Sequence, residues 1–277
     1  MAPGAALPAR ALILAVDIGG TKLAAGLVDR SGHLTAAVTV PTPATGVWDA
    51  LCSLVTGVVS AAPHGALVGC GVGCGGPMAA RGEEVSPLNI PSWRRFPLRR
   101  RLAEHAGLPA WVDNDAKALA MAEGWTGAAA GRRDFVAMVV STGVGGGVVS
   151  EGRLLGGRLG NAGHIGHVVV EPDGRRCACG GRGCLEAEAS GTAIAAVTGR
   201  PATDATPEVV DRCGTLVGRA VGSVANLLDL DLAVVGGSVA LGFGAPFLAA
   251  AQREARARAG LDFAAGVRVV PAGLGPD

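Results

Sequence analysis

Three apolar runs in this chain end in glycine-rich turns that carry hydroxyl or charged side chains. They are Val16–Lys22 (VDIGGTK), Val140–Gly147 (VSTGVGGG) and Val234–Ser238 (VVGGS), about a hundred residues apart. Glycine lets the backbone approach a ligand closely, and backbone amides, threonine and lysine donate hydrogen bonds to phosphate oxygens. Each motif alone is weak, because glycine commonly follows a strand. Together they favour an α/β chain that binds phosphate.

The first motif carries the most chemistry. Its aspartate, Asp17, could hold Mg²⁺ through water, although a plain β-turn is an equal alternative for these residues alone. The predicted nucleotide or phosphate ligands are Asp17, Gly19, Gly20, Thr21, Lys22, Thr142, Gly143, Gly145, Gly236 and Gly237, with the second turn extending over 143–147.

Apolar runs alternate with stretches of helical spacing along the chain. Strands are expected at 11–17, 23–29, 67–72, 110–112, 135–141, 147–150 and 232–235, and helices at 48–60, 97–106, 116–125, 189–198, 207–229 and 246–259. Such alternation indicates an α/β fold. A chain of 277 residues is long enough for two domains, expected at 1–113 and 114–277.

The charge balance gives little reason to expect a polyanionic partner. The net charge is +1, so no overall field attracts nucleic acid or an anionic membrane. The basic run Arg94–Arg101 could be a nucleic-acid patch, but a solvated helix face is favoured. The uncharged run Leu232–Gln252 holds four glycines and a proline, and Asp17 interrupts the first apolar run too early for a signal peptide. A cytoplasmic protein is therefore expected.

The strongest local signal is a cluster of thiols and imidazoles within residues 163–186. His167, Cys177, Cys179 and Cys184 have the spacing H-x9-C-x-C-x4-C. Three thiolates and one imidazole suit tetrahedral Zn²⁺, and four protein ligands leave no position for a catalytic water. Cysteines serving as small hydrophobic residues are a poor alternative in so polar a loop. The remaining four cysteines lie singly among apolar residues and are expected to be buried thiols.

Asn114-Asp115 lies between an expected strand and an expected helix. A carboxylate there could accept the proton of a sugar hydroxyl as its oxygen attacks a phosphate, but an aspartate before a helix is also a good cap. Gly76 and Asn89, in the segments GGP and LNIPSW, could complete a sugar pocket. An ordinary loop role remains the alternative for Asn89.

These motifs, taken together, resemble the ROK family (repressors, open reading frames and sugar kinases) over essentially the whole chain. The matching segments are DIGGTK, GVGCGGP, LNIPSW, NDA, STGVGGG, GHIGH with the cysteine loop and GCLE, and VVGGS. The resemblance implies an actin-like ATPase or sugar kinase fold, with two α/β domains and ATP in an interdomain cleft. It also implies ATP, Mg²⁺ and a structural Zn²⁺ as cofactors.

The resemblance implies a role for each matching residue. Asp115 is expected to be the general base, Asn89 and Asn114 sugar ligands, and Glu186 an acceptor from a sugar hydroxyl. His167 is expected to bind zinc and line the sugar pocket, so that zinc orders the loop. The implied partners are a sugar and ATP, with no nucleic acid or membrane, in a homodimer or homotetramer.

One departure bears on the substrate. Glucokinases of the family usually have glutamate where this chain has His164, and the form G-H-I-G-H resembles bacterial N-acetylmannosamine kinases. A neutral histidine can donate to an acetamido carbonyl, whereas glutamate only accepts; alternatively, His164 only packs in the pocket wall. The expected activity is phosphorylation of the 6-hydroxyl of N-acetylmannosamine or a related hexose. Glucose is the alternative substrate, and a non-catalytic sugar sensor the alternative function.

The two ends of the chain also differ from parts of the family. Repressor members carry a helix-turn-helix domain before the first glycine motif, and the sixteen residues before Asp17 are too few for one. The family normally continues beyond the final Ala272–Asp277 with a helix that returns to the N-terminal domain. A truncated chain is therefore expected, in which stability and activity would depend on the missing helix.

Overall fold

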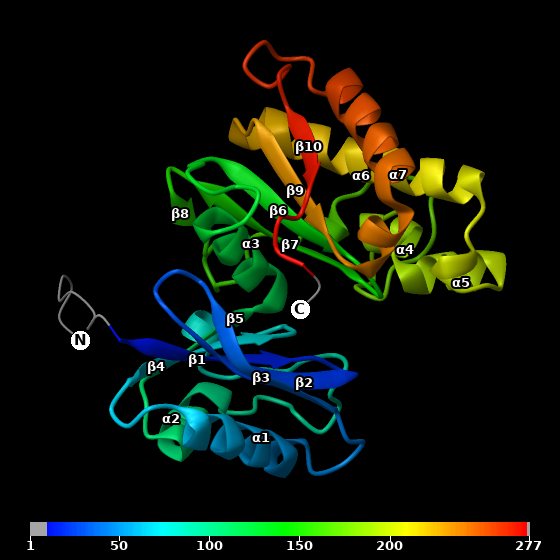
Figure 1. The fold of residues 1–277 in the computed structure, drawn as a ribbon. Helices are drawn as coiled ribbons and strands as arrows, with labels where there is room; N and C mark the ends of the chain where they lie inside the picture. The colour runs from blue at the N-terminus through cyan, green and yellow to red at the C-terminus, as the bar shows by residue number, and fades with distance from the viewer. Residues whose placement is uncertain (1–9, 276–277) are drawn as a thin grey trace. The chain divides into compact units, whose positions relative to one another are not determined.

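The computed structural model describes residues 10–275 and divides them into two compact units (Figure 1). Unit 1 contains the chain up to 118 together with 157–161, and unit 2 contains 119–156 and the chain from 162 onward. The sequence-based boundary between 113 and 114 lies inside unit 1. Residues 1–9, part of the stretch considered for a signal peptide, and residues 276–277 at the chain end lie outside the described residues.

Unit 1 is built on a mixed five-stranded sheet of order β3-β2-β1-β4-β5. Its strands are β1 (Leu12–Ile18), β2 (Lys22–Val28), β3 (Leu34–Pro41), β4 (Leu67–Cys74) and β5 (Ala110–Asn114). Strands β1, β2 and β3 are antiparallel neighbours, whereas β4 pairs in parallel with β1 and β5. The expected hairpin of the first two strands is confirmed, and β3 is an edge strand that was not expected.

Two helices cover the sheet of unit 1. Helix α1 (Val47–Ala61) packs against β2 and β3, and α2 (Leu98–Ala106) packs against β5 (Figure 1). A short 3₁₀ turn, η1 (Ala80–Gly82), lies against β5. The core between these layers is apolar; its fully buried members include Leu14, Ile18, Leu23, Leu51, Val55, Cys70, Cys74, Leu98 and Leu102.

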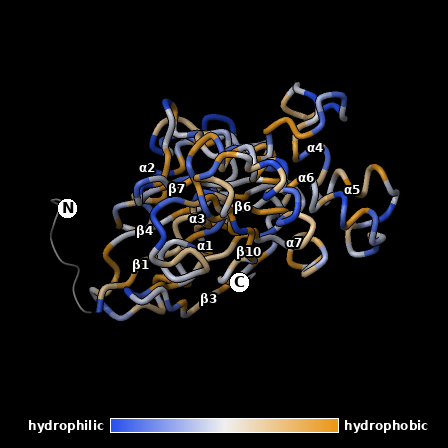
Figure 2. Tube along the Cα trace, turned by 90° about the horizontal axis from the view of Figure 1, so that it is seen from above, coloured by the Kyte–Doolittle hydropathy of each residue, from blue (hydrophilic) through white to orange (hydrophobic). Residues whose placement is uncertain are grey.

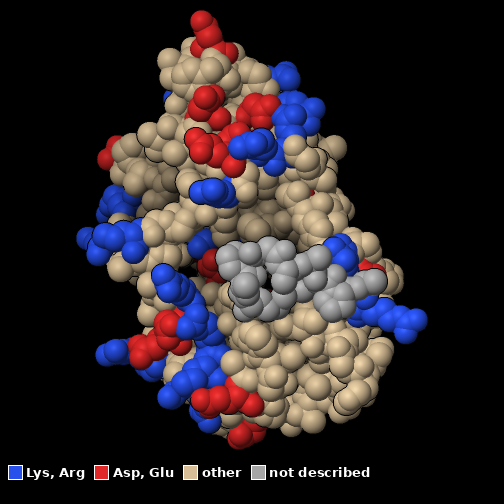
Figure 3. All heavy atoms as spheres, turned by 90° about the vertical axis from the view of Figure 1, so that its left-hand side faces the viewer, with Lys and Arg blue, Asp and Glu red and all other residues tan. Residues whose placement is uncertain are grey.

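Two of the five arginines in the basic run before and within α2 pair with carboxylates. Arg95 and Arg99 pair with Glu84 and Glu83, and the Arg101 guanidinium lies 4.5 Å from the centroid of the Trp48 ring. On the face in Figure 3, basic side chains lie interspersed with acidic ones. These contacts agree with the solvated helix face that the sequence favoured.

Aromatic rings pack beside this run. Phe96 stacks on Trp93 with ring centroids 4.3 Å apart, and it contacts Trp48 at 5.6 Å. Trp93 is 3% exposed. Stacked and tilted rings add to the apolar burial and fix the loop that precedes α2.

Unit 2 is also built on a five-stranded sheet, of order β10-β9-β6-β7-β8. Its strands are β6 (Phe135–Val140), β7 (Val144–Ser150), β8 (Arg153–Leu154), β9 (Leu232–Gly236) and β10 (Arg268–Pro271). Strands β6, β7 and β8 form an antiparallel meander, whereas β9 pairs in parallel with β6 and β10. The expected α/β class is confirmed in both units.

The helices of unit 2 are α4 (Leu185–Ala189), α5 (Gly191–Thr198), α6 (Pro207–Leu228) and α7 (Ser238–Arg258), with 3₁₀ turns η2 (Ile165–His167) and η3 (Ala202–Asp204). Helix α6 packs closely along α7, because it presents glycine every four residues. A β-carbon on Gly214 would lie 2.4 Å from the Phe247 carbonyl oxygen, and one on Gly218 would lie 2.4 Å from that of Ala251. Only glycine allows these backbones to approach so closely. Figure 2 shows hydrophobic stretches alternating with hydrophilic ones along the chain.

Two expected helices differ from the observed ones. The helix expected at 189–198 is α5, which begins two residues later, because Ser190 is extended and its side chain caps α5 by accepting from the Ala193 amide. The short helix α4 before it was not expected. The last helix begins at Ser238 rather than Pro246 and is broken at Gly244, whose φ is 62°. None of the described helices combines the length and the apolar composition needed to cross a membrane.

A buried glutamate joins α3 (Asp115–Trp125) to the segment that follows β10. Glu123 is 0% exposed, and its Oε2 accepts hydrogen bonds from the amides of Ala128 (2.7 Å) and Gly273 (3.0 Å). Its Oε1 accepts from the amide of Leu274 at 3.0 Å. Three peptide dipoles thus satisfy one buried carboxylate, as burial of a charge requires.

Replacing Glu123 with glutamine is expected to lower the free energy of unfolding by about 2–4 kcal/mol, because an amide NH₂ would face donors that need acceptors. Urea unfolding followed by circular dichroism measures this change. Glu104→Gln, at an exposed position of α2, serves as the control and is expected to change stability by less than about 0.5 kcal/mol. Equal stability of the two variants would contradict the proposed role of Glu123.

Candidate functional site

The first glycine motif forms the tight turn between β1 and β2. The Gly19 amide donates to the Lys22 carbonyl at 3.0 Å, and the side chains of Thr21 and Lys22 are exposed. Thr42, just after β3, holds this turn from the side: its hydroxyl donates to the Gly19 carbonyl at 2.7 Å and its amide to the Thr21 carbonyl at 3.0 Å. Sequence reasoning missed Thr42, because its partners lie more than twenty residues away.

Asp17 and Asp115 come together at the carboxyl ends of parallel strands. Asp17 pairs with Gly73 across β1 and β4, and Gly73 pairs with Asp113 across β4 and β5. A β-carbon on Gly73 would lie 3.5 Å from both Asp17 Oδ1 and the Asp115 α-carbon. Burial, and next the charge of Asp115, raise the pKa of Asp17, while Lys22 acts in the opposite direction. The two carboxylates therefore form an anionic pair that a cation or a proton would stabilise.

Asn114 shares the capping of α3 with Asp115. The helix begins at Asp115, and the Ala116 amide donates to Asn114 Oδ1 at 3.1 Å and to Asp115 Oδ1 at 2.8 Å. Within the described part of the chain, Asp115 Oδ2 has no hydrogen-bond partner. Capping thus accounts for one oxygen of Asp115 and leaves the other available for chemistry.

The predicted sugar ligands of unit 1 lie at the same sheet edge. A β-carbon on Gly20 would lie 2.6 Å from the Asn89 β-carbon, so Asn89 packs on the glycine turn. A β-carbon on Gly76 would lie 3.9 Å from Asn114 Nδ2. The structure therefore gathers Asn89, Gly76 and Asn114 near Asp17 and Asp115.

A buried lysine that sequence reasoning did not select supports this edge. Lys117 is 3% exposed, and its Nζ donates to the Gly160 carbonyl at 2.9 Å and lies 2.9 Å from Asp113 Oδ1. The same oxygen accepts from the Asn114 amide at 2.8 Å. The ion pair of Lys117 with Asp113 fixes the end of β5, and the bond from Lys117 to Gly160 attaches residues 157–161 to unit 1. The i,i+4 spacing of Asp113 and Lys117 was the available signal.

In unit 2 the second and third glycine motifs lie side by side. Val139 of β6 pairs with Gly236 of β9, so both strands end at the same edge. The hydroxyls of Ser141 and Ser238 are 2.9 Å apart. A β-carbon on Gly237, whose φ is 96°, would lie 2.4 Å from the Val140 carbonyl oxygen. Thr142 and Gly143 follow directly in the turn, and Thr142 is exposed.

The second glycine turn is shorter than expected. Strand β7 begins at Val144, so Gly145–Gly147 lie in the strand and not in the turn. Packing explains one of these glycines, because a β-carbon on Gly146 would lie 2.8 Å from the Ile165 side chain. The neighbouring segment fits equally closely: a β-carbon on Gly166 would lie 2.1 Å from the Val144 carbonyl oxygen.

Glu186 and His164 approach this region from two directions. Glu186, on the short helix α4, accepts a hydrogen bond at Oε2 from the Val144 amide, 2.9 Å away. His164 precedes η2 and is exposed, and its ring is stacked on that of His167 with centroids 6.0 Å apart.

Four residues of the 163–186 loop form a compact cluster of metal-ligating atoms. One ligand atom each from His167, Cys177, Cys179 and Cys184 lies within 4.8 Å of the others. The Cys177 sulfur is 3.7 Å from His167 Nδ1, and the sulfurs of Cys179 and Cys184 are 3.7 Å apart. Zinc–ligand bonds of about 2.0–2.3 Å in a tetrahedron place ligand atoms roughly 3.5–3.8 Å apart. The cluster therefore has the composition and the dimensions of a four-ligand metal site.

The other four cysteines do not take part. Burial raises the pKa of Cys70 and Cys74 to about 12 and that of Cys213 to about 11, while Cys52 is half-buried and its pKa is also raised, first by burial. Such thiols are protonated at neutral pH and poor nucleophiles.

A surface pocket in unit 2 contains none of the sequence-predicted residues. It is lined mainly by charged residues near the start of β6 and the end of α6, among them Arg132, Arg133, Asp134 and Asp231. In this pocket Arg132 pairs with Asp231, and Arg133 donates to the Glu151 carbonyl. We do not assign a function to it.

Comparison with known sequences identifies a family. The sequence pattern of the ROK family matches residues 13–246. The chain is 39% identical to the N-acetylmannosamine kinase of Citrobacter koseri over 250 aligned residues. The alignment covers 83% of this chain and 84% of that protein.

Comparison with solved structures agrees. The chain is similar to a ROK family glucokinase from Streptomyces griseus in complex with glucose and AMPPNP, with a TM-score of 0.82, 31% identity and coverage of 95% of each chain. It is also similar to the ROK hexokinase from Thermus thermophilus, with a TM-score of 0.80, 35% identity and coverage of 96% of this chain and 94% of that one. These relatives have the actin-like ATPase fold. The chain belongs to the ROK family.

Proposed function

We propose that this protein is an ATP-dependent kinase that phosphorylates the 6-hydroxyl of N-acetylmannosamine or a related hexose. The observation that carries the proposal is the carboxylate pair of Asp17 and Asp115, intact at the sheet edge of a chain that belongs to the ROK family. A sugar sensor without turnover would have no need of this repulsive pair. The identity with N-acetylmannosamine kinases supports the choice of sugar.

Asp115 is the general base of the proposed reaction. Its Oδ2 accepts the proton of the 6-hydroxyl while the sugar oxygen forms a bond to the γ-phosphorus of ATP. The bond from that phosphorus to the β,γ-bridging oxygen breaks, and ADP leaves with the electron pair. Asn114 and Asn89, which lie near Asp115 in unit 1, hold the sugar by hydrogen bonds from and to their amide groups.

Asp17 holds Mg²⁺ in this proposal. Burial, and next the charge of Asp115, raise the pKa of Asp17, and a divalent cation would offset both effects. The ion would neutralise negative charge on the phosphates. In this proposal Thr21, Lys22 and the amides of Gly19 and Gly20 bind phosphate oxygens. In unit 2, Thr142 and Gly143, together with Gly236 and Gly237, lie against the nucleotide.

The thiol and imidazole cluster fits zinc by its donor set and spacing. All four positions would be filled by protein atoms, so zinc would be structural and would hold His167 in place. In this proposal both His167, near the start of the loop, and Glu186, at its end, contact the sugar. Zinc would thus act on the reaction only through the residues that it orders.

His164 is the proposed discriminator between an N-acetylated sugar and glucose. Its exposed ring, stacked on His167, can donate to an acetamido carbonyl. Glucose remains the second candidate substrate, supported by the similarity to the glucokinase from Streptomyces griseus.

Asp115→Asn is expected to lower turnover by about 10²–10⁴-fold, because the base is lost while the shape of the site is kept. Coupled ADP release measured with a panel of hexoses and hexosamines tests this, with calorimetry to show that sugar binding persists. The pKa of Asp17 should fall in the same variant, as the charge of Asp115 is gone. Asp49→Asn, exposed on α1, is the control. Wild-type protein that turns over no sugar in the panel would refute the kinase proposal.

His164→Glu is expected to lower the ratio of kcat/KM for N-acetylmannosamine to that for glucose by about tenfold, the effect of one hydrogen bond of roughly 1.4 kcal/mol. Steady-state kinetics with both sugars give the ratio. His33→Glu, at an exposed position between β2 and β3, is the matched control and should leave the ratio unchanged. An unaltered ratio in the His164 variant would exclude this residue as the discriminator.

Zinc is expected at about one ion per chain, measured by elemental analysis of the purified protein. Chelation, or Cys179→Ser, should remove the ion and weaken sugar binding in calorimetry, because His167 is released, while ATP binding is retained. Cys52→Ser, which changes a thiol outside the cluster, should retain the metal. Sugar affinity that is the same with and without metal would contradict the proposed link between the two.

A further inference from the structure

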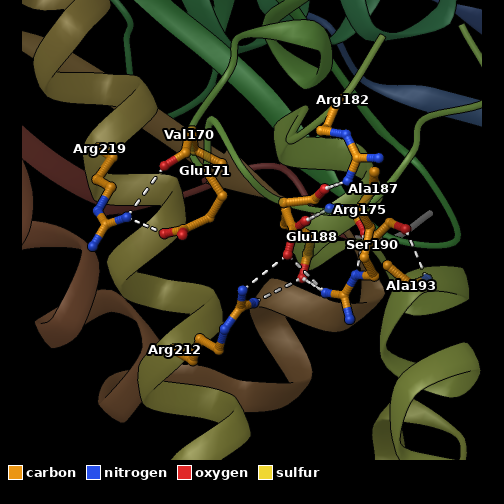
Figure 4. A network of polar contacts seen from close by, with 11 residues as sticks. Val170, Glu171, Arg175, Arg182, Ala187, Glu188, Ser190, Ala193, Arg212 and Arg219 are labelled. Carbon is orange, nitrogen blue, oxygen red and sulfur yellow. Dashed lines mark hydrogen bonds and ion pairs between the residues drawn. The ribbon is translucent and has the colours of Figure 1, made fainter. Parts of the chain in front are cut away.

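A buried carboxylate lies at the base of the metal-binding loop. Glu188 is on α4, two residues after Glu186, and its side chain is 2% exposed. Figure 4 shows Glu188 between two arginines that come from different elements: Arg175 from the loop and Arg212 from α6. Sequence reasoning assigned no role to any of these three residues.

The carboxylate of Glu188 is fully engaged. Its Oε1 accepts from the Arg175 amide at 2.6 Å, and its Oε2 accepts from Nη2 of Arg175 at 2.9 Å and Nη2 of Arg212 at 2.8 Å. Burial acts to raise the pKa of Glu188, but the hydrogen bonds and charges of Arg175 and Arg212 outweigh it, so the pKa lies below its usual range. Glu188 is therefore a charged, paired group at neutral pH.

The same arginines also hold the backbone of α4. Arg175 Nε donates to the Ala187 carbonyl at 3.0 Å, and its Nη2 donates to the Glu188 carbonyl at 3.1 Å. Arg212 Nη1 donates to the Glu188 carbonyl at 3.3 Å. These carbonyls belong to the last turn of a five-residue helix, where helical partners are lacking. The network thus fixes both the position and the end of α4.

A second contact from α6 holds the other side of the loop. Arg219 Nη1 donates to the Val170 carbonyl at 3.2 Å and pairs with Glu171 (Figure 4). The Nε of Arg219 lies 3.1 Å from Glu254 Oε1. The two sides are then joined directly, because the Val170 amide donates to the Gly183 carbonyl at 2.8 Å. Through Arg212 and Arg219, helix α6 therefore supports both sides of the loop.

The metal-ligating residues and the network hold different ends of α4. Cys177 and Cys179 are in the tip of the loop, and Cys184 is the N-cap residue of α4. Arg175 and Arg212 instead bind the last carbonyls of the helix. Glu186, which lies on the same short helix as Glu188, reaches the Val144 amide at 2.9 Å beside the glycine turn. Any movement of so short a helix at Glu188 displaces Glu186.

We propose that Glu188 is a positioning residue: by binding Arg175 and Arg212 it fixes α4, and thereby Glu186, through contacts that include none of the metal-ligating residues. The consequence for catalysis rests on the proposed function, in which Glu186 binds the sugar. Loss of the Glu188 charge should then affect the sugar and not the nucleotide. It should also leave the metal bound, because all four metal-ligating residues are unchanged.

Glu188→Gln tests this proposal, with Glu254→Gln as the matched control. Glu254 is a carboxylate that also pairs with two arginines, Arg219 and Arg258. It joins α6 to α7 and reaches the loop only through Arg219, on the side of Val170 and Glu171, and it forms no hydrogen bond to α4. Amide hydrogen exchange of peptides covering 168–190, zinc content, and the KM values for sugar and ATP are measured for both variants and the wild type.

The Glu188 variant is expected to keep its zinc, to exchange faster in 168–176 and 185–190, and to show a sugar KM raised about tenfold with the ATP KM within about twofold of wild type. The Glu254 variant should match the wild type in zinc content, in exchange over 185–190 and in both KM values. Wild-type protein treated with a chelator should lose more protection in 177–182 than in 185–190. Because exchange is measured without substrate, a wild type that lacks sugar turnover would refute the proposed function while the exchange data still decide the role of Glu188.

Wild-type exchange rates and sugar KM in the Glu188 variant would overturn the proposal. So would an equal rise of sugar KM in the Glu254 variant, which would make general destabilisation the cause. Should the Glu188 variant fail to fold, Arg212→Gln replaces it, since Arg212 is half exposed and its loss leaves the Glu188–Arg175 pair. A roughly threefold rise in sugar KM with faster exchange in 185–190 is expected there; no change in either would overturn the proposal equally.

Discussion

Parallel strand pairing brings together most of the residues to which we assign a function. In unit 1 the register of β1, β4 and β5 places Asp17 and Asp115 at one edge, and in unit 2 the pairing of β6 with β9 joins two glycine turns. A parallel sheet collects the carboxyl ends of its strands, so residues distant in sequence become neighbours without long-range side-chain contacts. The chemistry of each unit then depends on the turns that follow those ends.

Close approach of backbone segments is the second constraint on this chain. Many of its 45 glycines fill places where a β-carbon would meet a backbone oxygen or a buried side chain, as between α6 and α7. Composition alone associated the glycines with turns and ligands. The structure divides them between turns, such as Gly19 and Gly237, and packing positions in strands and helices, such as Gly146 and Gly214. A glycine after an apolar run is thus only in part a sign of a ligand.

The sequence was sufficient for features with a local pattern. The α/β class, the first hairpin and the spacing of His167 with the three cysteines all follow from residues close together in the chain. Strand β3 was missed because an exposed edge strand has no buried face to mark it. The partners of Glu188 and Lys117 were missed because Arg212 and Gly160 lie 24 and 43 residues away, and nothing local indicates which buried charges will meet.

The aromatic packing beside α2 gives the protein a spectroscopic property. The chain has four tryptophans and no tyrosine, so its ultraviolet emission arises from very few rings. Trp111 and Trp125 are more than half exposed, whereas Trp93 is buried against Phe96 in the loop that also carries Asn89. An aqueous quencher such as iodide reaches the exposed rings first. The emission that survives quenching then has a larger contribution from buried Trp93, in the loop that carries the predicted sugar ligand Asn89. Trp93 is thus a reporter of this loop that the sequence already contains.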